Sequence, residues 1–243
     1  MRKFFALFLT LVFTLTIPAV YGLPQAGAVP FTVLKNTIWS GTVIMPEGFY
    51  IAPDATLTLM PGTVVKLGGN IGVKGKIKAI GTQNEPIIFT SLKDDVKEDS
   101  NKDGDVSKPS PGDWGNVEFP DNCGICELYQ VQFLYGGKGG FGTLKFSSGK
   151  GSDDRIRVSH CTISKSASMG AWFANSTSVL RECVITDCQD PKTGAGIWIQ
   201  EDSNPSISGC TVERCTIGIQ IDLSCSPKLL GNIIKNCGTN GIK

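Results

Sequence analysis

Short apolar runs recur at regular intervals along the C-terminal half of the chain. Each copy has an apolar residue, a residue three positions later that is most often Cys, and a second apolar residue two positions further on, as in Leu180-x-x-Cys183-x-Ile185. Five copies begin at Leu128, Val158, Leu180, Ile207 and Leu229. The steps between them are 30, 22, 27 and 22 residues, so a base period of 22 with insertions of eight and five residues explains them. Such a period indicates a solenoid of stacked coils.

A second run of alternating residues follows each of the last four copies. These runs are Gly170-Ala-Trp-Phe-Ala, Gly196-Ile-Trp-Ile-Gln, Gly218-Ile-Gln-Ile-Asp and Gly241-Ile-Lys. A period of two residues is typical of strands, and Gly and Asn between the runs suit tight corners. Looser runs of the same kind begin near residue 40, and no later segment has the period of a long helix. The predicted fold class is all-β.

The repeat carries a family resemblance. A coil of about 22 residues with inward Ile, Leu and Val, a ladder of Asn or Cys at one corner and a Gly-Ile-x-Ile strand resembles the right-handed parallel β-helix proteins of the pectin-lyase-like superfamily. The resemblance to the secreted β-helix repeat type covers about residues 40–243. It implies a right-handed parallel β-helix. It implies little about function, because this solenoid carries lyases, hydrolases, adhesins and accessory proteins.

Residues 1–22 have the pattern of a signal peptide. Arg2 and Lys3 precede an almost wholly apolar stretch from Phe4 to Phe13, and small residues follow near Ala19. The alternative is an uncleaved anchor, although the apolar stretch is shorter than a span of about 20 residues requires. We therefore expect cleavage to leave a β-helix domain at 23–243 with no membrane span. The mature protein would then be secreted, periplasmic or on the cell surface.

Composition narrows the function classes. The 23 Lys and Arg residues balance 22 Asp and Glu residues, giving a net charge of +1, which argues against a nucleic-acid binder. His160 is the single histidine, so a metal site with several His ligands is excluded.

Nine cysteines are present, and the repeat places six of them in two columns. The columns are Cys161, Cys183 and Cys210, and Cys188, Cys215 and Cys237. They would form either a disulfide staple along the solenoid or a stack of buried thiols. The spacing of stacked strands, about 4.8 Å, exceeds the Cβ separation of about 3.8 Å in a disulfide and favours thiols. The separate pair Cys123 and Cys126 fits a local disulfide or simple packing.

An acidic insertion at 92–113 interrupts the coil rhythm. Within it, Asp99, Asn101, Asp103 and Asp105 alternate as in the first half of a calcium-binding loop, with a Gly after the third ligand. The twelfth position is Ser110 instead of Glu, so the motif departs from the full pattern. We expect a structural Ca²⁺ site here; the alternative is a solvated loop.

Two tryptophans occupy equivalent positions in successive coils. If Ala171 and its equivalents point inward, Trp172, Trp198 and Gln220 point outward on neighbouring coils, with Asp222 close by. Indole rings stack on the apolar faces of sugars, while amides and carboxylates bond their hydroxyls. These four residues are therefore the predicted site for a polysaccharide or cell-surface glycan. The alternative is that a loop covers the rings as a small packing cluster.

Catalysis has less support in the sequence. Asp153, Asp154, Arg155, Arg157 and His160 lie close together, but adjacent carboxylates in a strand would point to opposite faces. The Gly-His-Gly element of polygalacturonase-like relatives is absent. We predict an exported, surface-associated or carbohydrate-interacting module. The alternative is a polysaccharide lyase or glycoside hydrolase of the pectin-lyase-like group. A third interpretation is similarity to the periplasmic β-helix proteins of copper-enzyme maturation, in which the cysteine columns would bind metal.

The C-terminal coil ends abruptly. The last copy begins at Leu229 and the sequence stops after Gly241-Ile-Lys, two residues into the strand that the other coils complete. Solenoids need a terminal cap with a polar outer face to remain soluble. The pattern therefore predicts a truncated or uncapped end and self-association through the C-terminal coil.

Overall fold

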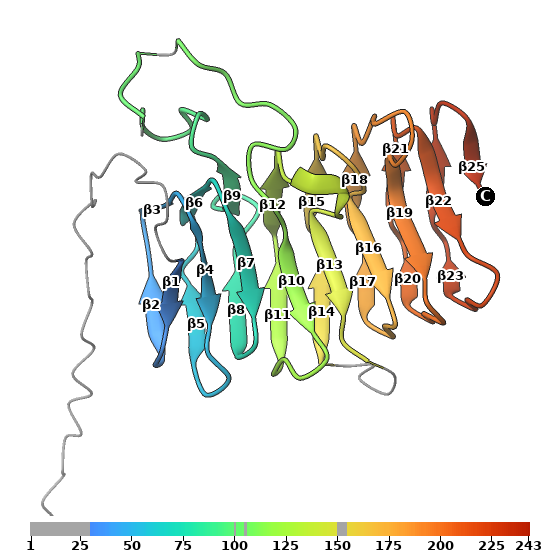
Figure 1. Cartoon of the computed structure of the whole chain (residues 1–243), viewed down its shortest axis with the longest axis horizontal. Helices are drawn as coiled ribbons and strands as arrows, with labels where there is room; N and C mark the ends of the chain where they lie inside the picture. Colours follow the sequence, from blue (N-terminus) through green and yellow to red (C-terminus); the bar gives the residue numbers. More distant parts are fainter. Residues whose placement is uncertain (1–29, 100, 105, 150–154) are drawn as a thin grey trace, which may run out of the picture.

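The computed structural model describes residues 30–99, 101–104, 106–149 and 155–243. The predicted signal peptide at 1–22 lies outside this part of the chain. The described residues form a parallel β-helix of eight coils stacked along the long axis of the molecule (Figure 1). No helix among them is long and apolar enough to span a membrane.

Each of the eight coils contributes one strand to each of three parallel sheets, which we name A, B and C, and sheet A has a ninth strand, β25, at its C-terminal end. Sheet A contains, in order, β1 (Phe31–Val33), β4 (Gly48–Ile51), β7 (Asn70–Val73), β10 (Val117–Pro120), β13 (Leu144–Ser147), β16 (Ala171–Ala174), β19 (Ala195–Gln200), β22 (Ile217–Ile221) and β25 (Asn240–Ile242). Sheet B contains β2 (Thr37–Trp39), β5 (Thr56–Leu59), β8 (Lys76–Ile80), β11 (Cys126–Tyr129), β14 (Ile156–Ser159), β17 (Val179–Arg181), β20 (Ser206–Ser208) and β23 (Lys228–Leu230). Sheet C contains β3 (Thr42–Met45), β6 (Val64–Leu67), β9 (Ile87–Ser91), β12 (Val131–Leu134), β15 (Thr162–Ser164), β18 (Val184–Thr186), β21 (Thr211–Glu213) and β24 (Ile233–Lys235).

The register of the strands matches the sequence repeat. Leu180 pairs with Ile207 and Ile207 with Leu229 on sheet B. Ile185 pairs with Val212 on sheet C, so the two apolar positions of one copy line different walls of the interior. These side chains are fully buried except for Leu229 in the last coil, which is half-buried.

Aromatic rings stack in the interior along the axis. The ring of Phe146 lies between Phe119, at a centroid distance of 5.4 Å, and Phe173, at 4.5 Å. Phe89 stacks on Phe133 in the same way at 5.1 Å. In-register parallel strands repeat each inward position from coil to coil, so equal side chains at equal positions meet face to face.

Charged residues occupy several of the corners where we expected Gly and Asn. His160 and Glu182 adopt left-handed conformations between sheets B and C, with φ of 54° and 52°. Asp187 and Arg214 do so after sheet C, with φ of 60° and 52°. This conformation is unusual for residues other than Gly and Asn. The hydrogen bond from Arg214 Nε to Asp187 Oδ1, 2.9 Å long, links two such corners in successive coils.

Candidate functional site

The predicted tryptophan pair lies on the outer face of sheet A. Trp172 on β16 pairs in register with Trp198 on β19, which pairs with Gln220 on β22. The neighbours Ala171 and Phe173 point inward and are fully buried. Strand alternation therefore places the indoles outward as predicted.

Trp172 is in contact with an aromatic ring and a cation. Its ring stacks on Phe141 at a centroid distance of 5.6 Å and an interplanar angle of 24°. Lys145 Nζ lies 5.2 Å from the Trp172 ring and 5.3 Å from the Phe141 ring. The same ammonium forms an ion pair of 2.8 Å with Glu118. Both the stacking and the cation–π contacts fix the orientation of the indole.

Trp198 is fixed by a hydrogen bond. Its Nε1–H donates to Asp222 Oδ1 over 3.1 Å, so these two predicted residues are in direct contact. Both indoles remain half-buried because they pack on a small outer cluster of Met169, Ala195 and Ile217. Each ring thus packs on the outer cluster and is also partly exposed. The arrangement therefore has features of both predicted alternatives, the exposed glycan site and the packing cluster.

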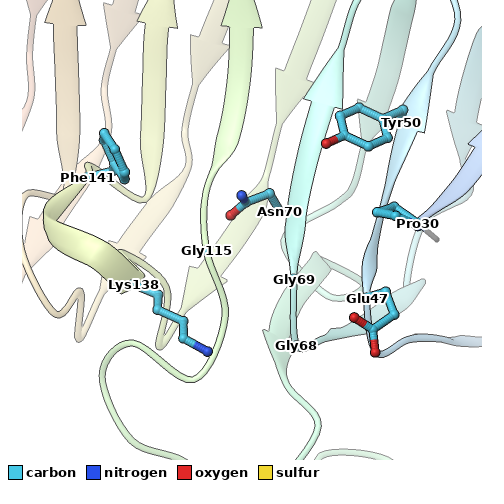
Figure 2. A pocket seen from close by; sticks show the side chains of 9 residues that line it. All are labelled: Pro30, Glu47, Tyr50, Gly68, Gly69, Asn70, Gly115, Lys138 and Phe141. Atoms are coloured by element: carbon cyan, nitrogen blue, oxygen red, sulfur yellow. The ribbon is translucent and has the colours of Figure 1, made fainter. Parts of the chain in front are cut away.

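A cavity of about 310 Å³ opens on the same face of the solenoid, nearer the N-terminus. Figure 2 shows that it is lined by two aromatic rings, an amide and one charge of each sign. The side chains that supply these groups are those of Glu47, Tyr50, Asn70, Lys138 and Phe141. Because Phe141 lines the cavity and also stacks on Trp172, the cavity and the tryptophan pair form one surface. We call this surface the sheet A groove.

Glycines allow the backbone beside the groove to pack closely. A Cβ on Gly115 would lie 1.5 Å from Asn70 Oδ1, and one on Gly72 would lie 2.4 Å from the Tyr50 ring. Both positions therefore exclude larger residues, and the Tyr50 ring lies flat across the strand of the next coil. Of the two, Gly115 lines the cavity, so its missing side chain leaves that space open.

The predicted calcium ligands lie in the long connection between β9 and β10, which projects from one edge of the solenoid (Figure 1). Asp99 accepts hydrogen bonds from the backbone N–H groups of Asp103 and Gly104, at 3.3 and 2.9 Å. Asn101 Nδ2 donates to Asp103 Oδ2 at 3.0 Å. Asp105 lies outside the described residues. In this structure the side-chain oxygens of Asp99 and Asp103 accept hydrogen bonds within the connection. The calcium site therefore stays a prediction.

A buried lysine anchors the start of this connection to sheet C. Lys66 on β6 is fully buried and its ammonium donates to the backbone carbonyl of Glu98. Burial lowers the pKa of Lys66 more than Glu98, Asp94 and other nearby carboxylates raise it. Asp94 in turn accepts a hydrogen bond of 2.5 Å from Thr90 Oγ1 on β9. The nearby carboxylates thus compensate in part for the burial of the Lys66 ammonium.

The residues considered for catalysis do not come together as one site in the described part of the chain. Asp153 and Asp154 lie outside that part. Arg155 donates to the backbone carbonyls of Cys123 and Ser148, both at 3.3 Å, while Arg157 is exposed on the outer face of sheet B. His160 instead pairs with Glu182, at 2.9 Å between Nε2 and Oε2, at the corner of sheets B and C.

All nine cysteines are free thiols, which matches the stacked-thiol interpretation. Cys183 lies between Cys161 and Cys210, and contact with Cys161 is the main cause that raises its pKa. Contact with Cys215 and burial likewise raise the pKa of Cys188. Within the residues described, no group of three or more His, Cys, Asp or Glu side chains is arranged to hold a metal ion. The buried thiols of both columns belong to the hydrophobic core, where they pack as small apolar side chains.

Sequence reasoning missed the N-terminal half of the groove. The signal was present in Val117-Glu-Phe-Pro and Leu144-Lys-Phe-Ser, two alternating runs 27 residues apart that place Glu118 and Lys145 in the Trp172 row. The insertion at 92–113 interrupts the repeat just before these runs, so their equivalence to the strands of the later coils was not recognised. Tyr50 belongs to the same outward row, because it pairs with Gly72 and Gly72 pairs with Glu118, so superposing the coils could have found it. Phe141 carries no repeat signal, because it meets the groove from the corner before β13.

Comparison with known proteins supports the fold. A family model described as a right-handed β-helix region matches residues 122–243, which is half of the chain. No curated protein and no solved structure gives a significant match. Together with the three parallel sheets, the match confirms the predicted right-handed parallel β-helix.

Proposed function

The chain belongs to the right-handed β-helix family, and on this basis we propose that it is an exported, surface-associated module that binds polysaccharide in the sheet A groove. The observation that carries the proposal is the register of Trp172 and Trp198 on adjacent coils, with Asp222 bonded to the second indole. Two fixed, partly exposed rings one coil apart suit a ligand that repeats along the axis.

The rest of the groove favours an extended ligand. Phe141 continues the aromatic surface from Trp172 into the cavity, where Tyr50 provides a further ring. Lys138 and Glu47 lie at the same cavity, and both a hydroxyl-rich chain and one with scattered carboxylates would find partners there. A polysaccharide lying along the solenoid would contact both aromatic rings and polar groups.

The test is a glycan-array screen followed by calorimetric titration of the best oligosaccharide. Trp198→Leu retains an apolar cover over Met169 and Ile217 but removes the flat ring, so we expect about tenfold weaker binding and nearly unchanged melting. Tyr129→Ala, which removes an exposed aromatic ring from sheet B, is the matched control and should bind like wild type. Equal affinity in Trp198→Leu and wild type would contradict the proposal.

The same oligosaccharides should be assayed for new reducing ends and unsaturated products. The proposal predicts binding without turnover. Product formation by the wild-type protein would replace it with the lyase or hydrolase alternative. Loss of product in Trp198→Leu would then assign the groove to substrate binding.

A further inference from the structure

The outer face of sheet B carries exposed cations without ion-pair partners. Lys76 and Lys78 lie on β8, Arg157 on β14 and Arg181 on β17, and all four are exposed. In the described part of the chain none of them forms a salt bridge. Glu127 pairs in register with Lys78 on one side and Arg157 on the other, so it supplies a carboxylate between these two cations. The face is therefore positive in a protein whose net charge is only +1.

The solvent-accessible cations on the described strands of the other two sheets are paired. Lys145 on sheet A bonds Glu118 at 2.8 Å, and Lys235 on sheet C bonds Glu213 at 3.1 Å. Arg214, at the corner after sheet C, bonds Asp187 at 2.9 Å. Among the strand residues that the structure describes, exposed cations outside an ion pair thus lie on the sheet B face.

Large apolar side chains are exposed among these cations. Ile38 on β2 is 43% exposed, Ile80 on β8 is 38% exposed and Tyr129 on β11 is 39% exposed. Ile80 and Tyr129 are paired in register, next to the row that contains Lys78 and Arg157. Lys and Arg around exposed aliphatic and aromatic side chains are the composition of surfaces that lie on anionic membranes. A soluble polyanion would use the charges but has no use for the apolar groups.

We propose that the outer face of sheet B docks on an anionic lipid surface. Its cations would bind the headgroups while Ile80 and Tyr129 enter the interface. Sheet A is a different wall of the solenoid, so a protein docked through sheet B would keep its groove open. The proposal does not depend on what the groove binds.

The test is co-sedimentation of the full chain with vesicles of equal parts phosphatidylglycerol and phosphatidylcholine, compared with pure phosphatidylcholine vesicles. We expect a preference for the anionic vesicles that weakens with added salt. Lys78→Gln combined with Arg157→Gln should lower partitioning to anionic vesicles about 30-fold, at roughly 1 kcal/mol per cation. Lys165→Gln combined with Lys192→Gln removes equal charge from exposed corners between sheets C and A, outside the sheet A groove, and should have no comparable effect.

A separate variant tests the apolar contribution. Ile80→Ser leaves every charge in place, so weaker partitioning with unchanged melting would support insertion into the interface. The apolar residues 4–13 near the N-terminus are common to all variants, so the comparison between variants removes their contribution. Equal partitioning of the two double variants would overturn the proposal. Binding to heparin with no vesicle preference, or no effect of Ile80→Ser, would instead assign the face to a soluble polyanion.

Discussion

We expect Phe146→Ala to destabilise the protein more than any other single truncation of one aromatic side chain in the central coils. Phe146 is fully buried and stacks on both Phe119 and Phe173, at 5.4 and 4.5 Å. The three residues lie on adjacent strands that are paired in register, so the ladders hold the two flanking rings in place. The space left by the missing ring therefore cannot close by a shift of its neighbours.

The structure sets the size of the effect. Truncating a buried Phe to Ala costs about 3–5 kcal/mol, and the cost is greatest where the cavity does not collapse. Each lost ring pair adds about 0.5–1.5 kcal/mol beyond the buried area. We therefore expect a loss of about 5 kcal/mol. Phe146→Leu fills most of the volume but also loses both ring pairs, so it should cost about 2–3 kcal/mol.

Urea unfolding followed by circular dichroism measures these differences. Ile234→Ala is the comparison, because Ile234 is an inward residue of the last coil and is only half-buried, so about 1 kcal/mol is expected. Each coil contacts only its neighbours, so a lower m value in Phe146→Ala would show that the two halves unfold separately. A cost for Phe146→Ala no greater than that for Ile234→Ala would refute the stacked column as the core.

Three further predictions concern the thiols, the acidic connection and the pH dependence of stability. Under native conditions an alkylating reagent should modify the half-buried Cys225 and Cys237 and spare the buried cysteines, and mass spectrometry that finds a disulfide would contradict the thiol columns. EDTA should lower the melting temperature and expose residues 92–113 to protease, and Asp103→Ala should mimic it; equal cleavage with and without Ca²⁺ would make the connection a solvated loop. Hydrogen bonding to Arg214 holds the pKa of Asp187 below its usual 3.8, so this stabilisation is complete above about pH 4 and lost as pH falls through the lower, folded pKa. Asp187→Asn should therefore reduce the acid dependence of the melting temperature, and an unchanged profile would remove this pair as a contributor.

The strict repeat explains why the C-terminal coils were predictable from sequence. Ile197 and Ile219 are 22 residues apart and pair directly, so superposing the copies reproduces the register of the strands. The Trp172 and Trp198 pair followed from the same superposition. A period-2 pattern also decides which side chains face the solvent.

The remaining features depend on contacts that a repeat does not encode. Lys66 lies in an otherwise apolar strand and is buried by residues of the connection beyond position 92. The sequence around Lys66 gives no sign of this distant contact, so its burial could not be predicted. Phe141 reaches Trp172 from a corner, so its role depends on the path of one connection. Corners with a left-handed residue other than Gly, such as Glu182 and Arg214, also lack a simple sequence signal, because long side chains adopt this conformation only where neighbouring coils hold it.

The hydrogen bonds between strands run along the axis of the solenoid, which makes its response to tension directional. A pull on the two ends of the β-helix would separate coils in turn, because each is bonded only to its neighbours. The step from Ile197 to Ile219 spans 22 residues, so releasing such a coil would lengthen the molecule by about 70 Å. The step from Ile71 to Val117 spans 46 residues and would release about 150 Å. The long connection would therefore add a long release step, and a force–extension trace should show it as one step about twice the size of a 22-residue step.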